Sequence, residues 1–293
     1  MSQEWNNLFQ YLFLRKSASF AELPTYAACS VLNFIYRRVP PSPLKYPLSV
    51  KQAWHSLERF QPSSPFWSAR APLPSVVNGP ARLRLASCCL DFNGTPDWNI
   101  SFADVEDTFC LHRWNWLLTQ SSAGTFPDRR EWGLRLMRDW LYHMGALKKG
   151  PAWTTYTTGE RICNAVLFLD LTASGQKIPD DITAAIEDMA FYLARRLEYN
   201  GRGATGNHVI NNARALCFAA KVCAQPRLLA LSEAILRHDL ERIVDSAGFL
   251  REGSSHYHFL ATRWLLETLW ALEGVGNDAL RAFIEQVARR MVE

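Results

Sequence analysis

Residues 180–199 read DDITAAIEDMAFYLARRLEY, and this stretch carries the pattern that decides the fold. Apolar residues recur every three or four positions, at Ile182, Ile186, Met189, Leu193 and Leu197. On a helix with about 3.6 residues per turn, this spacing places all five on one face. The stretch therefore predicts an amphipathic helix that buries one side against its neighbours.

The same periodicity occurs in seven other segments after Asp104. We expect helices at about 104–120, 128–147, 159–174, 208–224, 227–246, 256–273 and 277–293, separated by turn residues such as Gly150 and Gly274. Helices at this steady spacing favour antiparallel hairpins wound into a solenoid or a closed α/α toroid. No internal sequence repeat accompanies them. The predicted fold class is all-α, with little or no β structure.

The N-terminal third differs in character. Short helical patterns occur at Trp5–Leu14, Thr25–Arg37 and Val50–Phe60, and five prolines interrupt the segment from residue 61 to residue 80. Ala81–Asn93 alternates over a few positions, which indicates a short strand or hairpin before a turn at Gly94. We therefore divide the chain into a lead-in, residues 1–94, and a helical domain, residues 95–293.

Composition narrows the function classes. The 293 residues are 48% apolar and 20% charged, which is ordinary for a globular protein with a large core. Lys and Arg total 32, of which 25 are Arg, a bias that suits an anionic ligand or solvated ion pairs. The seven cysteines have neither metal-site nor secreted-framework spacing, so we expect buried free thiols and no metal or cofactor. We expect no nucleic-acid partner.

The N-terminus does not resemble an export signal. The apolar run Leu8–Leu14 is followed by Arg15 and Lys16, whereas a signal peptide carries its positive charge before the apolar run. We expect a cytoplasmic protein, or a periplasmic one if residues precede Met1. No apolar run of about 18 residues is present, so no membrane span is expected.

Two polar, glycine-containing segments stand out, and each precedes a predicted helix. They read EYNGRGATGNH at 198–208 and REGSSHYH at 251–258. Asn207 can donate amide hydrogen bonds, His208 can change protonation near neutral pH, and Tyr257 has a phenolic proton that could be moved. These groups can stabilise an anion and transfer a proton, which points to proton abstraction beside a carboxylate.

Four segments together resemble the N-terminal toroid of the heparinase II/III-like polysaccharide lyases. They are GNHVINNARAL at 206–216, REGSSHYH at 251–258, LHRW at 111–114, and a spaced pattern with Trp153, Tyr156, Gly159, Glu160, Arg161, Ile162 and Asn164. The resemblance covers roughly residues 95–275. It implies an incomplete α/α toroid that cleaves a uronic-acid-containing polysaccharide by β-elimination. The C-terminal β-sandwich usual in that family is not expected in this chain.

The resemblance also implies roles for individual residues. Asn207 matches the residue that neutralises the substrate carboxylate, Tyr257 the residue that transfers the proton, and His208 a residue that assists as base or holds the uronate. We expect the anionic sugar to contact Arg113, Trp114, Arg161, Arg202, Arg251, Glu252 and His258.

Each of these residues also has a purely structural interpretation. Asn207 could cap a helix, Tyr257 could be a core aromatic, and Glu252 could cap a helix or pair with an arginine. The arginines could form structural ion pairs, and the tryptophans are more typical of a core. Two other functions stay open. One is an inverting glycoside hydrolase using Glu160 and Glu252, and the other is a non-catalytic carbohydrate-binding protein.

Overall fold

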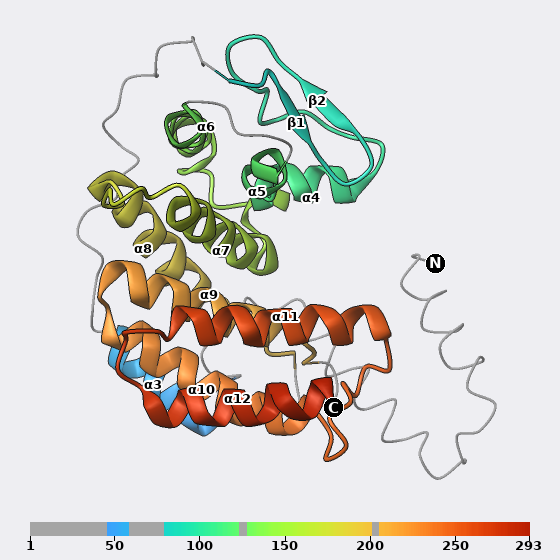
Figure 1. Cartoon of the computed structure of the whole chain (residues 1–293), viewed down its shortest axis with the longest axis vertical. Coiled ribbons are helices and arrows are strands. Elements are labelled where there is room, and N and C mark those ends of the chain that lie inside the picture. The colour runs from blue at the N-terminus through green and yellow to red at the C-terminus, as the bar shows by residue number, and fades with distance from the viewer. Residues whose placement is uncertain (1–45, 59–78, 123–127, 201–204) are drawn as a thin grey trace, which may run out of the picture.

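The structure is a computed structural model that describes residues 46–58, 79–122, 128–200 and 205–293 (Figure 1). The helices predicted at Trp5–Leu14 and Thr25–Arg37 lie outside these ranges. The described helices are α3 (Leu48–Glu58), α4 (Val105–Arg113), α5 (Trp116–Ser122), α6 (Arg129–Met144), α7 (Thr155–Leu171), α8 (Asp180–Ala194), α9 (His208–Cys223), α10 (Pro226–Ile243), α11 (Ser255–Ala271) and α12 (Asp278–Val292). A short 3-10 helix, η4 (Pro151–Trp153), precedes α7. The prediction of an all-α fold is confirmed.

Helix α9 lies at the centre of this arrangement. It packs against α7, α8, α10 and α11, and every residue from Val209 to Ala220 is buried. Small residues let the four neighbours approach closely, namely Ala213, Ala215, Ala219 and Ala220. A helix that is buried all round belongs in the core of a helical domain. Successive antiparallel helices therefore wrap around α9 in a toroid-like stack.

The helices form layers on either side of this centre. Figure 1 shows α4, α5 and α6 beyond α7 on one side, and α10, α11 and α12 on the other. Helix α3, from the predicted lead-in, packs against α10. Its Val50, Trp54 and Leu57 join the same apolar core as the later helices. The boundary predicted between residues 94 and 95 stays a prediction, since this core includes residues from both sides of it.

Apart from an isolated bridge between Val244 and Leu250, the β structure in the described ranges is one short hairpin. Strands β1 (Arg82–Arg84) and β2 (Cys89–Asp91) pair antiparallel, with Leu83 opposite Leu90. These two leucines point into the core, whereas Arg82 and Asp91 form an exposed ion pair on the other face. The alternation read in residues 81–93 therefore produces the expected hairpin.

The single helix predicted at 104–120 is wrong, because the structure divides it into α4 and α5. Trp114 ends α4 in the left-handed conformation, with φ of 61°. Its indole is fully buried against Trp140, at 5.3 Å between ring centroids. The Trp116 indole N–H donates to the carbonyl of Leu111 across the break, at 3.0 Å. Burial of the two indoles therefore offsets the strain of a non-glycine residue at positive φ.

Candidate active site

Asn207 begins the central helix without capping it in the usual way. Its backbone carbonyl accepts the first helical hydrogen bond, from the Ile210 N–H at 2.9 Å, but its side chain makes no capping bond. The residue is only 4% exposed. Its backbone N–H donates to Oε1 of Glu252 at 2.8 Å, and Nδ2 donates to Oε2 of the same carboxylate at 3.0 Å. Glu252 therefore joins the start of α9 to the loop before α11.

Tyr257 lies in the first turn of α11, five residues after Glu252 along the chain. Ser254 caps this helix by accepting a hydrogen bond from the Tyr257 N–H at 3.3 Å. The Tyr257 side chain is exposed, and within the described residues its hydroxyl makes no hydrogen bond to protein. A phenol in this setting is open to a substrate. The two sequence segments singled out above thus meet through the Asn207–Glu252 pair.

His208 is the first residue of α9, and two groups hold its imidazole. Nδ1 lies 3.2 Å from Oε1 of Glu198, and the ring lies 4.7 Å from the ring of Tyr156. The hydrogen bond to Glu198 raises the pKa of His208. The charge of Glu252 adds to this shift, while partial burial and the charge of Arg113 oppose it. His208 therefore has a fixed orientation and a raised proton affinity beside Asn207.

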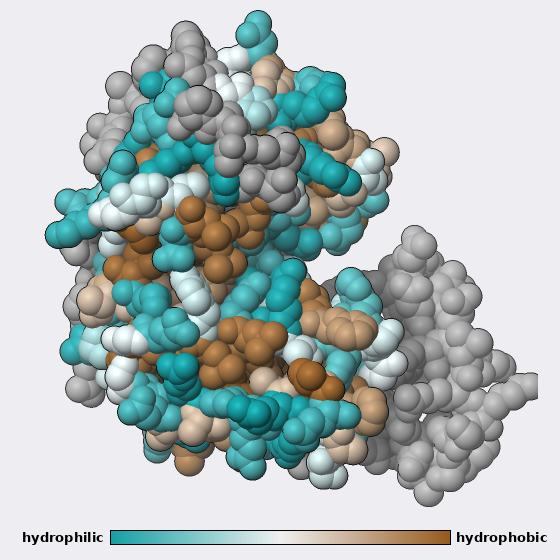
Figure 2. Space-filling view, viewed as in Figure 1, coloured by the Kyte–Doolittle hydropathy of each residue, from teal (hydrophilic) through white to brown (hydrophobic). Residues whose placement is uncertain are grey.

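Arg113 and Tyr156 extend the site on the side of α4. The Arg113 guanidinium lies 4.9 Å from the centre of the Tyr156 ring, and its Nη1 donates to Glu106 at 2.9 Å. Burial and the charge of Glu160 raise the pKa of Tyr156, against the charge of Arg113, so its hydroxyl stays protonated. Arg113, Tyr156 and His208 thus form one contiguous group. Figure 2 shows the surface hollowed between the α4–α5 region and α11.

Below these groups, an ion-pair network connects α7, α9 and α11. Arg214 is fully buried and lies 2.7 Å from Glu160 and 2.6 Å from Glu267. Arg263, which is half exposed, lies 3.3 Å from Glu267 and 3.9 Å from Glu160. Both carboxylates considered for a hydrolase are therefore engaged within the protein, Glu160 by arginines and Glu252 by Asn207.

Two residues predicted to contact the sugar are buried. Arg161 is 0% exposed and donates to the carbonyls of His112 and Ala152, at 2.8 and 2.7 Å. Burial lowers the pKa of its guanidinium to about 9. Trp114, 1% exposed, packs against Trp140 beside it. Neither side chain presents a surface that a sugar could touch in this structure, because both fill the space between α4, η4 and α7.

The remaining residues that we expected to contact the sugar differ in where the structure places them. His258 lies on α11 but its Nε2 donates to the carbonyl of Met291 at 2.8 Å, so it ties α11 to α12. Arg251 is exposed in the loop beside Glu252, and its backbone N–H donates to Ile243. Arg202 lies outside the described residues. The structure thus brings together Asn207, His208, Glu252 and Arg113, and it places Tyr257 five residues after Glu252 in the first turn of α11.

Sequence reasoning gave no role to Tyr156 and Glu198, although both contact His208. Tyr156 belongs to one of the segments quoted above, and Glu198 opens another. The sequence signal that could have identified Tyr156 and Glu198 was their position beside other polar residues in these segments. Their contact with His208 depends on how α7 and the segment after α8 pack against the start of α9, which no local pattern specifies.

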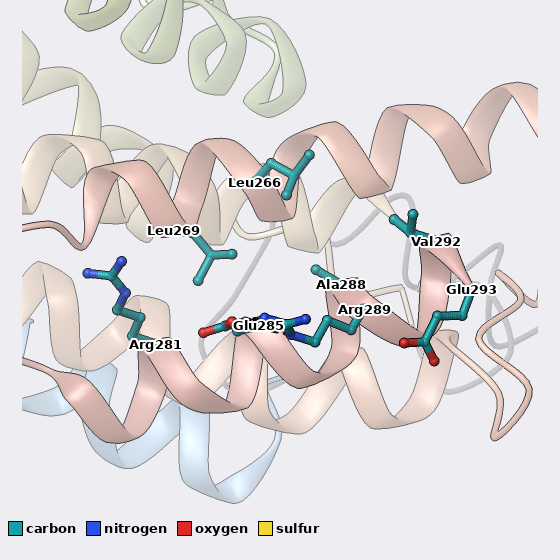
Figure 3. Close-up of a pocket in the computed structure, with 8 residues that line it drawn as sticks. All are labelled: Leu266, Leu269, Arg281, Glu285, Ala288, Arg289, Val292 and Glu293. Atoms are coloured by element: carbon teal, nitrogen blue, oxygen red, sulfur yellow. Dashed lines mark hydrogen bonds and ion pairs between the residues drawn. The ribbon is translucent and has the colours of Figure 1, made fainter.

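A pocket of about 460 Å³ opens elsewhere, between α11 and α12 (Figure 3). It is lined by Leu266, Leu269, Arg281, Glu285, Ala288, Arg289, Val292 and Glu293. Figure 2 shows apolar surface over this part of the molecule, where Leu266 and Val292 are exposed. Glu285 and Arg289 pair with each other at 2.6 Å. This pocket includes none of the predicted site residues.

Across the described ranges, no three His, Cys, Asp or Glu side chains gather into a group that could hold a metal ion. No helix in those ranges is long and apolar enough to cross a membrane. The six cysteines in them are free thiols. Cys110, Cys163 and Cys217 are buried as expected, whereas Cys89 is exposed.

Comparison with solved structures relates this architecture to known lyases. No family model matches the sequence, and no curated protein matches it. A heparan sulfate lyase from Pedobacter heparinus has a similar structure, with a TM-score of 0.52 and 15% identity, over 83% of this chain and 42% of that chain. A heparinase III structure gives a TM-score of 0.51 and 18% identity, over 69% of this chain and 33% of that one. The chain thus has a heparinase-like helical fold and spans less than half the length of either structure.

Proposed function

We propose that this chain is a lyase that cleaves a uronic-acid-containing polysaccharide by β-elimination. The observation that carries the proposal is the Asn207–Glu252 contact, which joins the start of α9, bearing Asn207 and His208, to the loop that leads into Tyr257. The likeness of the fold to a heparan sulfate lyase supports it. An acidic substrate accords with the guanidinium of Arg113 and the raised pKa of His208 beside it.

The reaction depends on groups of the protein in two of its steps. The proton on the carbon next to the uronate carboxylate leaves to a base, and its electron pair forms a carbon–carbon double bond. The bond to the glycosidic oxygen then breaks, and that oxygen takes a proton. The first step requires neutralisation of the carboxylate, because the developing enolate carries extra negative charge. The second requires an acid within reach of the leaving oxygen.

The side chains divide these tasks as follows. Asn207 donates to the substrate carboxylate with the amide hydrogen that Glu252 does not use. The exposed phenol of Tyr257 takes the proton as phenolate and returns it to the leaving oxygen. His208, oriented by Glu198 and Tyr156, assists the proton transfer. Arg113 draws the anionic chain toward the site.

The test is incubation with a panel of uronate polymers, monitored for the ultraviolet absorbance of an unsaturated uronate. We expect the wild type to generate this chromophore. Asn207→Ala should reduce its rate on the order of 100- to 1000-fold, the usual loss on removing one such donor. A purely structural Asn207 would instead lower thermal stability and leave the rate per folded molecule unchanged. Binding of the polymers without any turnover would favour the carbohydrate-binding alternative.

A further inference from the structure

Glu252 contacts Asn207 through both of its carboxylate oxygens. The two hydrogen bonds, from the backbone N–H and from Nδ2, join residues 45 positions apart. A carboxylate can only accept hydrogen bonds, so the atom of the Asn207 amide that faces it must be nitrogen. Glu252 thereby fixes which way the amide points.

This orientation differs from the one that Asn207 would adopt alone. An asparagine at a helix start normally turns its side-chain oxygen toward the N–H groups of the first turn. Here no such capping bond forms, and Glu252 receives the amide nitrogen instead. The negative charge of Glu252 at the N-terminus of α9 also complements the helix dipole. The contact therefore replaces the local cap with a long-range one and leaves Oδ1 uncommitted to the helix.

Gly206 provides the room for this contact. A Cβ added at residue 206 would lie 2.8 Å from Oε1 of Glu252, closer than two such atoms approach. The obstructing atom is the end of a flexible side chain, and among the described residues beyond its chain neighbours no backbone atom is found within 4 Å of this position. A methyl group at residue 206 would therefore displace the Glu252 carboxylate and leave the backbone in place. The sequence thus has glycine, the smallest residue, at position 206, where the Glu252 carboxylate lies closest.

The loop that carries Glu252 is itself anchored. The Arg251 N–H donates to the Ile243 carbonyl at 2.8 Å, and the Gly253 N–H donates to the Leu250 carbonyl at 3.0 Å. Val244 and Leu250 form an isolated antiparallel bridge at the base of the loop. Gly253, with φ of 66°, then turns the chain into the Ser254 cap of α11. Glu252 therefore links Asn207 to the same short segment that places Tyr257.

We infer that Glu252 is a positioning residue, which orients the Asn207 amide and holds it in register with Tyr257, and that it is not a ligand of the sugar. This inference rests on the proposed function, and it replaces the expectation that Glu252 binds substrate. Misplacing a reacting group by about 1 Å can cost on the order of 100-fold in rate. Loss of the Glu252 contact should lower kcat, because the Asn207 amide must be aligned with the charge that develops in the transition state.

The experiment compares Glu252→Gln, Gly206→Ala, Asn207→Ala and the Asn207→Ala/Glu252→Gln double variant. Glu285→Gln is the control, since it removes an exposed carboxylate from a surface ion pair on α12. We expect Glu252→Gln and Gly206→Ala to lower kcat roughly 10- to 100-fold with little change in KM. The double variant should be no slower than Asn207→Ala alone, because Glu252 acts through that residue. Glu252→Gln at full activity, or losses that multiply in the double variant, would overturn the inference.

A second measurement separates this inference from the proposed function. In protein labelled with ¹⁵N-asparagine, the side-chain amide signal of Asn207 is identified by its loss in Asn207→Ala. It should shift in Glu252→Gln and Gly206→Ala, and stay in place in Glu285→Gln. If the wild type turns over no uronate polymer but the signal shifts, the lyase proposal fails and the positioning contact stands. If the signal does not move, the positioning role is wrong whatever the activity.

Discussion

At the scale of single residues, His208 gives the site its clearest pH signature. Its raised pKa, caused first by the hydrogen bond to Glu198, means that the folded protein holds this proton more tightly than the unfolded chain does. The resulting stabilisation is fully present below the ordinary pKa near 6.5, and it is lost as pH rises through the folded value. As a base, His208 becomes competent only above that raised pKa.

Glu198→Gln should therefore lower the pKa of His208 and move the acid side of the pH–rate profile to lower pH. An NMR titration of the His208 imidazole measures the first effect, and kcat/KM against pH measures the second. Glu285→Gln should change neither. An unchanged imidazole titration in Glu198→Gln would show that the 3.2 Å contact does not set this pKa.

The sequence could place Asn207 and Tyr257 at the starts of helices, because glycines and neighbouring polar residues mark the loops that precede them. It could not separate the partly buried Arg113 from the fully buried Arg161. Both residues stand in similar polar surroundings in the sequence, and only the packing of three tryptophans around Arg161 places it in the core. The sequence could not indicate that Glu252 is the partner of Asn207 either, because the two residues lie 45 positions apart.

At the scale of elements, Arg161 connects α7 to the end of α4 and to η4. Arg161→Met should leave the carbonyls of His112 and Ala152 without donors, at a cost of about 1–3 kcal/mol each, partly offset by relief of the buried charge. We expect a lower free energy of unfolding in a urea titration, with KM unchanged at temperatures where the variant is folded. A raised KM at unchanged stability would instead restore Arg161 as a sugar ligand.

Arg214 makes the corresponding connection between α7, α9 and α11. Arg214→Met leaves the Glu160 and Glu267 carboxylates without their buried partner, so it should cost about 3–5 kcal/mol of unfolding free energy. Arg263→Met is the matched control, because this half-exposed arginine pairs with the same two carboxylates and should cost at most about 1 kcal/mol. Equal losses of unfolding free energy in the two variants would contradict the assignment of Arg214 as the buried centre of this ion-pair network.

Helical periodicity predicted α9 and α11 closely. It extended the helix at 180–199 five residues beyond the end of α8 at Ala194, because Leu197 is buried from the segment after the helix and continues the apolar pattern. It placed the start of α7 four residues late, at 159, because Thr154 caps the helix by accepting from the Thr157 N–H, and the polar first turn carries no apolar stripe. It also missed the break at Trp114, which depends on indole burial against α6. Local patterns thus define helices well, whereas caps and breaks depend on tertiary contacts.

At the scale of the whole molecule, α9 accounts for both the fold and the site. Its buried middle holds four helices together, and its first turn brings Asn207 and His208 to the end where α11 begins. The heparinase-like fold is shared with lyases at 15–18% identity, so the arrangement of helices persists where most side chains differ. The function therefore has to be tested at the residues, since a fold alone hosts many activities.

The most direct test is cleavage of a uronate oligosaccharide in isotopically labelled water, followed by mass spectrometry of both fragments. Elimination transfers no oxygen from water, whereas hydrolysis adds one to each bond cleaved. When the fragments are analysed before the new hemiacetal exchanges its oxygen with water, we predict unlabelled products with an unsaturated uronate end from the wild type, and no cleavage by Tyr257→Phe. Saturated fragments that carry the water label, formed equally well by Tyr257→Phe, would contradict the account.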